Sequence, residues 1–334
     1  MLYKLLNHIL DPEIVFRIVH SVFIIGWVFD YVFIFLSVLF LFINPIFSLL
    51  YPSYYVFALV FDKLPFFNYI SNSYINLYKK YIKYEIKEDI NEEFNRSNKK
   101  NQIYILGPHG IFMNGPISIG LFNLTRENAK NFLLFVAPTL IYNPTVIILS
   151  KIIQNGNTIQ GLTHKNVIKN LKENKYNICL SGGGFEELNL YSNDFNPIYT
   201  GRWLYWIRNA IQHGYDINFC YCYGATQDYP SKLSIHDNLS KRIEYAKKYI
   251  PFNSINIKFP VLPYNNVKMT PIFFHMELPY CPDITKEETK IYLKKFYAKF
   301  REVLDASSPS DGQIPFDIID DLDTLYDEID KKDK

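Results

Sequence analysis

The first candidate for acid–base chemistry in this sequence is His109. The apolar run from Ile103 to Leu106 predicts a buried strand, and Gly107-Pro108 predicts a turn that presents His109 at the carboxyl end of that strand. Imidazole titrates near neutral pH, and open α/β sheets place reactive groups just beyond the carboxyl ends of their strands. The position alone leaves two interpretations open, a structural histidine that caps the turn and a general base.

A glycine-rich turn is the second candidate. Gly182, Gly183 and Gly184 follow the apolar run from Asn177 to Leu180, which also predicts a strand. Backbone amides exposed in such a turn can hold an anion or a developing oxyanion, and Glu186 is placed to orient an imidazole. The run is not a phosphate-binding P-loop, a dinucleotide fingerprint or the Gly-x-Ser-x-Gly elbow of a serine hydrolase. A purely structural glycine turn is the alternative.

The other histidines and the cysteines favour structural roles. His213 ends a predicted helix, where an imidazolium complements the helix dipole, and His275 lies in an apolar strand. Cys220 and Cys222 alternate along one predicted strand, which puts both on the same face as small core residues. The four cysteines lack the spacing of a metal site, and a net charge of +2 without a basic run gives no indication of nucleic-acid binding.

The elements that must position these residues alternate between strand and helix. Strands are predicted at 103–106, 132–137, 158–161, 177–180, 217–223 and 270–277. Helices are predicted at 115–123, 144–154, 164–174, 202–213 and 286–303. This alternation predicts an α/β domain with a mostly parallel central sheet flanked by helices.

The amino-terminal region has a different character. From Ile14 to Phe61 the sequence is apolar, and Tyr31 to Leu50 supplies twenty residues without a charge, which at about 1.5 Å each match a hydrocarbon core of roughly 30 Å. The only acidic, basic or histidine side chains between Ile14 and Phe61 are Arg17, His20 and Asp30. Asn44-Pro45 breaks the run, which favours a hydrophobic helical hairpin over a single membrane span or a buried helix pair.

Four regions follow from these patterns. Residues 1–62 form the membrane hairpin or anchor, and 63–100 form an amphipathic interfacial helix, predicted from Phe66 to Glu93, with a linker. Residues 101–306 form the α/β domain, and 307–334 form an acidic carboxyl-terminal tail that we expect to be solvated.

Three motifs, taken in chain order, resemble those of one known family. Gly107-Pro108-His109-Gly110 is similar to a His-Pro-His-Gly signature, which is Glu-Pro-His-Ser in plants. Gly182 to Leu188 resembles a Gly-Gly-Ala-x-Glu-Ala-Leu motif, and Thr163 to Leu171 resembles the helix before it. Arg202 to Gly214 is similar to an Arg-Lys-Gly-Phe helix that ends in His-Gly. With the hydrophobic hairpin ahead of them, these motifs resemble the type-2 diacylglycerol acyltransferases and their monoacylglycerol and wax-alcohol relatives.

The resemblance implies a membrane-bound enzyme that transfers a fatty acyl group from acyl-CoA to a lipid hydroxyl, with diacylglycerol as the expected acceptor. His109 is then the general base and Glu186 its charge-stabilising partner. The amides near Gly110 or in Gly182 to Gly184 are the implied oxyanion donors. His164 begins a predicted helix near the glycine turn, and a structural role and a contact to the CoA phosphates are its two interpretations. The further motif and substrate-binding residues implied are Gly107, Pro108 and Arg202.

The resemblance also implies partners and a location. The partners are acyl-CoA as co-substrate, a neutral lipid acceptor and the bilayer, with no cofactor or metal, and a homo-oligomer is left open. The implied location is the endoplasmic reticulum membrane or the lipid-droplet surface, with the catalytic domain in the cytosol.

The chain departs from the family pattern at several positions. Gly107 replaces the first histidine, and Tyr223-Gly224-Ala225 replaces a Phe-Gly-Glu sequence, so that one carboxylate is missing. Arg202 lies one residue out of register with the arginine of the family. A lysophospholipid or glycerol-phosphate acyltransferase would need an aspartate five residues after His109, where this chain has Asn114. That activity and a non-catalytic lipid-binding protein are the alternatives.

Overall fold

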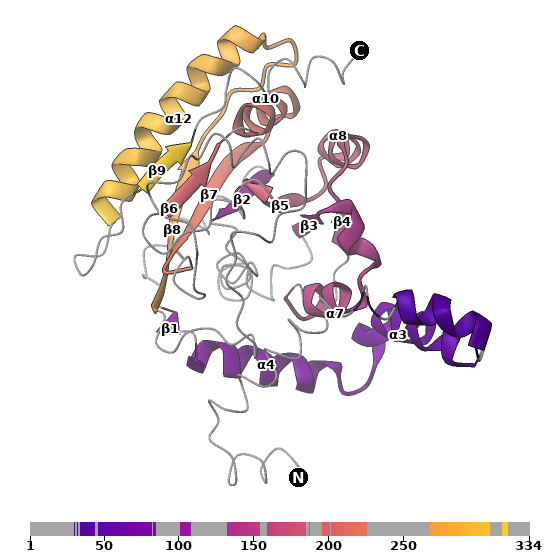
Figure 1. Ribbon diagram of the computed structural model, residues 1–334. Helices are drawn as coiled ribbons and strands as arrows, with labels where there is room; N and C mark the ends of the chain where they lie inside the picture. The colour runs from indigo at the N-terminus through magenta and orange to yellow at the C-terminus, as the bar shows by residue number, and fades with distance from the viewer. Residues whose placement is uncertain are drawn as a thin grey trace.

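The computed structural model describes residues 30, 32, 34–43, 46–81, 83–84, 101–107, 132–153, 159–184, 187, 196–200, 202–225, 268–307 and 316–319. Within them, a seven-stranded sheet has the order β1-β8-β7-β2-β5-β3-β4 (Figure 1). All neighbouring strands in this sheet pair in parallel, except that β7 and β8 are antiparallel. The α/β fold with a mostly parallel sheet, predicted from the alternating pattern, is therefore confirmed.

The strands of this sheet lie close to their predicted ranges, except β1, which was not predicted and falls inside the segment predicted to be an amphipathic helix. They are β1 (Lys83–Tyr84), β2 (Gln102–Gly107), β3 (Phe132–Val136), β4 (Ile159–Gly161), β5 (Asn177–Ser181), β7 (Asp216–Tyr223) and β8 (Lys268–Met276). The helices α7 (Pro144–Ile153), α8 (His164–Glu173), α10 (Trp203–His213) and α12 (Lys286–Ser307) were also predicted. The predicted helix over 115–123 lies outside the described residues.

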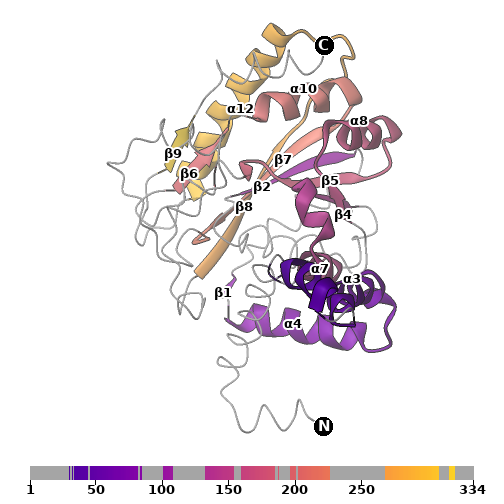
Figure 2. The same ribbon diagram turned by 45° about the vertical axis from the view of Figure 1, so that its right-hand side comes forward.

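Helices cover both faces of the sheet (Figure 2). Ile103, Ile105, Phe219 and Tyr221 point to one face, where they share a buried core with α8, α10 and α12. Tyr104, Leu106 and the cysteines of β7 point to the other face, where they share a second core with α7 and the helices before it. This alternation is the period of two that strands impose on their side chains. The prediction that Cys220 and Cys222 are core residues on one face is confirmed, because both are fully buried there.

The amino-terminal apolar region is described only in part. A helix over 34–43 is followed by η1 (Phe47–Leu49), α3 (Leu50–Val60), η2 (Phe61–Lys63) and α4 (Phe67–Tyr81). No helix among the described residues is both long enough and apolar enough to cross a membrane. The first 29 residues of the predicted hairpin and Asn44-Pro45 lie outside the described residues. Of the helix predicted from Phe66 to Glu93, α4 accounts for Phe67–Tyr81, whereas Lys83–Tyr84 form the strand β1.

The acidic tail contributes a strand that the sequence reading missed. Strand β9 (Phe316–Ile319) pairs in parallel with β6 (Asn196–Tyr199) in a separate two-stranded sheet. Its alternating Phe316 and Ile318 are a short strand signal inside a charged segment, and four residues are too few to separate it from a loop by pattern alone.

Candidate functional site

Two predicted motifs meet at the carboxyl edge of the central strands. Leu106 of β2 pairs with Ser181 of β5, so that Gly107 and Gly182 leave neighbouring parallel strands side by side. The edge is set by topology, because β2 lies between β5 and β7 and all three run in the same direction. Pro108, His109, Gly110 and Glu186 lie outside the described residues, so their side chains stay predictions.

Gly107 is packed under aromatic rings of β7. It pairs with Tyr221, and a Cβ atom at this position would lie 3.2 Å from Cζ of Phe219 and 3.9 Å from Cδ2 of Tyr221. A larger side chain at position 107 would therefore displace one of these buried rings. This packing gives a physical reason for glycine at position 107.

The glycine-rich turn is constrained by packing as well. A Cβ at Gly182 would lie 2.4 Å from Cγ2 of Ile105, and one at Gly183 would lie 2.4 Å from Cβ of Glu187. Gly184 has a φ of 54°, in the left-handed region that glycine adopts readily. The turn after β5 thus needs glycine at three consecutive positions, whatever it binds.

Glu187 is a buried acidic residue at this edge that sequence reasoning missed. Its side chain folds back over Gly183, its carboxylate Oε2 accepts a hydrogen bond from the Tyr199 amide at 3.3 Å, and the residue is only 5% exposed. Burial, and then the charge of Glu187, hold the pKa of Tyr221 well above its usual value. The Glu186-Glu187 pair was the available signal, but the sequence does not show which of the two carboxylates turns inward.

The buried carboxylate changes what the glycine turn can bind. In its ionised form Glu187 would repel an anion beside Gly183 across a few ångströms of poorly solvated protein, where charge interactions are strong. Two buried polar atoms lie nearby, Oγ of Ser181 and Nε1 of Trp203, and neither has a hydrogen-bond partner within the described part of the chain. Nε1 of Trp203 lies 3.3 Å from the position of a Cβ on Gly182. This edge therefore brings two neutral polar groups close to the buried Glu187 carboxyl group.

His164 and Arg202 begin two helices at the same edge. His164 is the first residue of α8, which follows β4, and its Nδ1 lies 2.9 Å from the Tyr205 hydroxyl of α10. Thr163 caps α8 by accepting a hydrogen bond from the Asn166 amide at 3.2 Å. Arg202 is exposed and immediately precedes α10, which ends beside the amino end of β7. The fold thus brings Gly107, the glycine turn and both helix starts to one edge.

Comparison with known proteins identifies no relative. No family model, curated protein or solved structure matches this chain. The case for a function therefore depends on the residues at this edge and on the motifs that they form.

The residue at the end of the Tyr223-Gly224-Ala225 sequence is buried. Ala225 is 1% exposed and packs in the core on the α7 side of the sheet. A glutamate there would be costly without a hydrogen-bond partner, so alanine suits this environment. Among the described residues no cluster of His, Cys, Asp and Glu could hold a metal ion.

His213 differs from the expectation that an imidazolium complements the end of α10. Burial and the positive charge of Lys172 lower its pKa from the usual 6.5. A lowered pKa means that the unfolded chain binds the proton more readily, so stability is present above about pH 6.5 and is lost as the pH falls below it.

We expect His213→Gln to flatten the pH dependence of stability. The free energy of unfolding of both proteins is measured in urea at about pH 7.5 and about pH 5.5. It should fall less between the two pH values in the variant, because glutamine does not titrate. The effect should be modest, since His213 is partly exposed. An equal loss in both proteins would show that other groups account for the acid sensitivity.

Proposed function

We propose that this protein is a membrane-bound O-acyltransferase that transfers a fatty acyl group from acyl-CoA to a lipid hydroxyl, most readily that of diacylglycerol, at the carboxyl edge of β2 and β5. The observation that supports it best is the pairing of Leu106 with Ser181, because it places the start of the His109 motif beside the glycine turn that carries Glu186 and Glu187. Neighbouring strand ends are where α/β proteins assemble sites from separate motifs.

In the proposed reaction His109 acts as general base. Its imidazole takes the proton of the acceptor hydroxyl while that oxygen attacks the thioester carbonyl carbon. The tetrahedral intermediate collapses with cleavage of the carbon–sulfur bond, and the CoA thiolate leaves and can recover the proton from the imidazolium. Glu186 stabilises the imidazolium that forms during the reaction.

The buried carboxylate of Glu187 bears on where the oxyanion is held. Because this carboxylate lies over Gly183, the amides of the glycine turn are a poor place for a second negative charge. We therefore place the oxyanion at the amides near Gly110. The proposal retains His164 and Arg202, at the starts of α8 and α10, as contacts for the CoA phosphates.

The membrane part of the proposal is supported by exposed apolar side chains in the amino-terminal helices. Phe42, Ile43 and Ile46 are 85%, 68% and 74% exposed, and no charge occurs from Tyr31 to Phe61. Exposed apolar surfaces of this kind mark membrane or protein contacts. An acceptor dissolved in the bilayer would explain why an α/β domain carries such helices, and the endoplasmic reticulum membrane or lipid droplet is the proposed location.

The test is an acyl-transfer assay with the full chain in vesicles that contain diacylglycerol. We expect labelled oleoyl-CoA to yield labelled triacylglycerol, and monoacylglycerol and a long-chain alcohol are assayed in parallel. Transfer to lysophosphatidic acid alone would replace the proposal with the glycerolipid alternative. No transfer to any acceptor, from protein that binds the vesicles, would favour a non-catalytic lipid-binding protein.

A further inference from the structure

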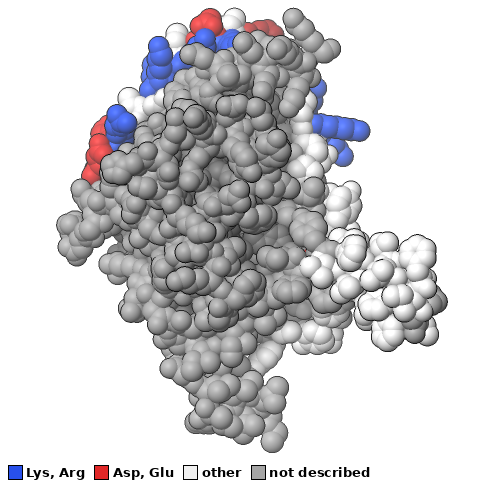
Figure 3. Space-filling model, in the orientation of Figure 1, with Lys and Arg blue, Asp and Glu red and all other residues white. Residues whose placement is uncertain are grey.

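The described amino-terminal helices form an uncharged lobe at one side of the molecule. We define the apolar lobe as described residues 32–60, and Figure 3 shows it as a projection that carries no charged side chain on the face in view. Its exposed apolar residues include Phe35, Leu41, Phe42, Ile43, Ile46 and Leu49. The lobe must join the sheet domain through its remaining surface.

The apolar part of this junction involves α7. Ala58 and Phe61, from the end of α3 and the start of η2, lie in the same buried core as Ile147, Ile148 and Ile152 of α7. Apolar packing of this kind is strong but not directional, so by itself it would allow one helix to slide over the other.

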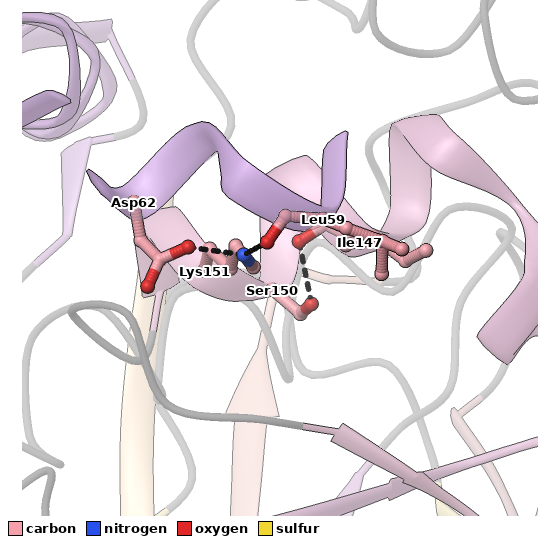
Figure 4. Close-up of polar contacts among 5 residues, drawn as sticks. All are labelled: Leu59, Asp62, Ile147, Ser150 and Lys151. Carbon is pink, nitrogen blue, oxygen red and sulfur yellow. Dashed lines mark hydrogen bonds and ion pairs between the residues drawn. The ribbon is translucent and has the colours of Figure 1, made fainter. Parts of the chain in front are cut away.

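A lysine of α7 adds directional hydrogen bonds at one end of the junction. Nζ of Lys151 donates hydrogen bonds to the carbonyl oxygen of Leu59, at the end of α3, and to the carboxylate of Asp62 in η2 (Figure 4). The Lys151 side chain is 9% exposed and that of Asp62 is 21% exposed. The cation also complements the negative end of the α3 dipole.

The amino-terminal end of α7 is joined to the same region. The amide of Thr145 donates a hydrogen bond to Oδ2 of Asp30 at 3.2 Å, and Asp30 is 1% exposed. The Thr145 hydroxyl shares a hydrogen bond of 2.8 Å with the hydroxyl of Tyr54 in α3, and Tyr51 donates to the carbonyl oxygen of Tyr142 at 2.8 Å. These contacts explain an aspartate in the apolar stretch, because its carboxylate accepts from the positive end of a helix.

We propose that Lys151 is a positioning residue that locks the apolar lobe to α7, so that the lobe and the sheet move as one rigid body and the carboxyl edge keeps a fixed orientation toward the bilayer. Two observations favour positioning over simple stabilisation. A buried ion pair often contributes little net stability compared with apolar residues, and here it joins Lys151 to two groups, one at the end of α3 and one in η2. The polar contacts also lie at both ends of α7, where together they prevent sliding and rotation. The proposal depends on the proposed function only for what the orientation serves.

The test measures the distance between spin labels on the lobe and on the sheet domain, in full-length protein bound to phosphatidylcholine vesicles. Phe42→Cys places one label on the lobe and Lys165→Cys places the other on α8, after replacement of the partly exposed Cys281 by serine. The other cysteines described in the structure, Cys179, Cys220 and Cys222, are buried. This readout needs no catalysis, so it can fail or succeed independently of acyl transfer.

We expect a single, narrow distribution of label distances in the parent protein and a broad distribution in Lys151→Met. This substitution keeps the length of the side chain and removes its charge. Asp62→Asn removes only the ion pair and should broaden the distribution of label distances less than Lys151→Met does. If Lys151→Met fails to fold, the distances in Asp62→Asn alone test the proposal. Lys169→Met is the matched control, because it removes an exposed ion pair with Glu173 on α8. Lys151→Arg should restore the narrow distance. An unchanged narrow distance in both Lys151→Met and Asp62→Asn would overturn the proposal.

Discussion

Replacement of His109 by alanine is expected to lower the rate of acyl transfer by about 10²–10⁴-fold, since that is the usual contribution of a positioned general base. Folding and vesicle binding should not change, because the apolar lobe and the sheet core are built from other residues. The measurement is the initial rate of labelled triacylglycerol formation, with circular dichroism and vesicle flotation to check folding and binding.

The matched control is His213→Ala, which removes a histidine from the far end of α10. It should keep a rate close to that of the parent protein. The pH dependence gives a second check, since the parent rate should fall at acid pH as the base becomes protonated, and the residual rate of His109→Ala should lack that fall. A His109→Ala variant with the parent rate would show that another group accepts the proton.

Gly182→Ala is expected to destabilise the fold, because the glycine packs tightly against the central strand β2. The added Cβ would lie 2.4 Å from Cγ2 of Ile105, a β-branched residue that is 1% exposed in the central strand β2. Its methyl group cannot rotate away easily, because β-branched side chains have few χ1 options. Overpacking of this kind costs typically about 1–3 kcal/mol, so the midpoint of urea unfolding should fall accordingly.

Gly161→Ala is the comparison for this effect. Its new Cβ would meet Cα of Pro138 at 3.3 Å, a much milder approach that requires a shift of a few tenths of an ångström. We expect a clearly smaller fall in the unfolding midpoint than for Gly182→Ala. If Gly182→Ala is as stable as the parent protein, the contact between β2 and the glycine turn is looser than the structure indicates.

The sequence predicted the strands and helices of the sheet domain closely, because burial of one or both faces leaves a pattern in consecutive residues. The run from Ile217 to Tyr223 shows this well, since its odd and even positions pack into two different cores. Patterns of this kind do not predict the order of the strands in the sheet. The antiparallel pairing of β8 with β7 depends on where a distant segment returns to the sheet, and nothing local to either strand specifies it.

The candidate site likewise has features that the sequence predicted and features that only the tertiary structure showed. The residue types at Gly107 and Gly182 to Gly184 were enough to predict turns and a possible chemistry, because glycine permits backbone geometries that other residues resist. The sequence alone did not show that Glu187 is buried over Gly183 or that Phe219 and Tyr221 pack against Gly107. It also did not show that Lys151 reaches the end of α3, 92 residues earlier in the chain. Local composition therefore determined the elements and their turns, and the tertiary structure alone decided which charges and rings meet, since those contacts join segments far apart in the chain.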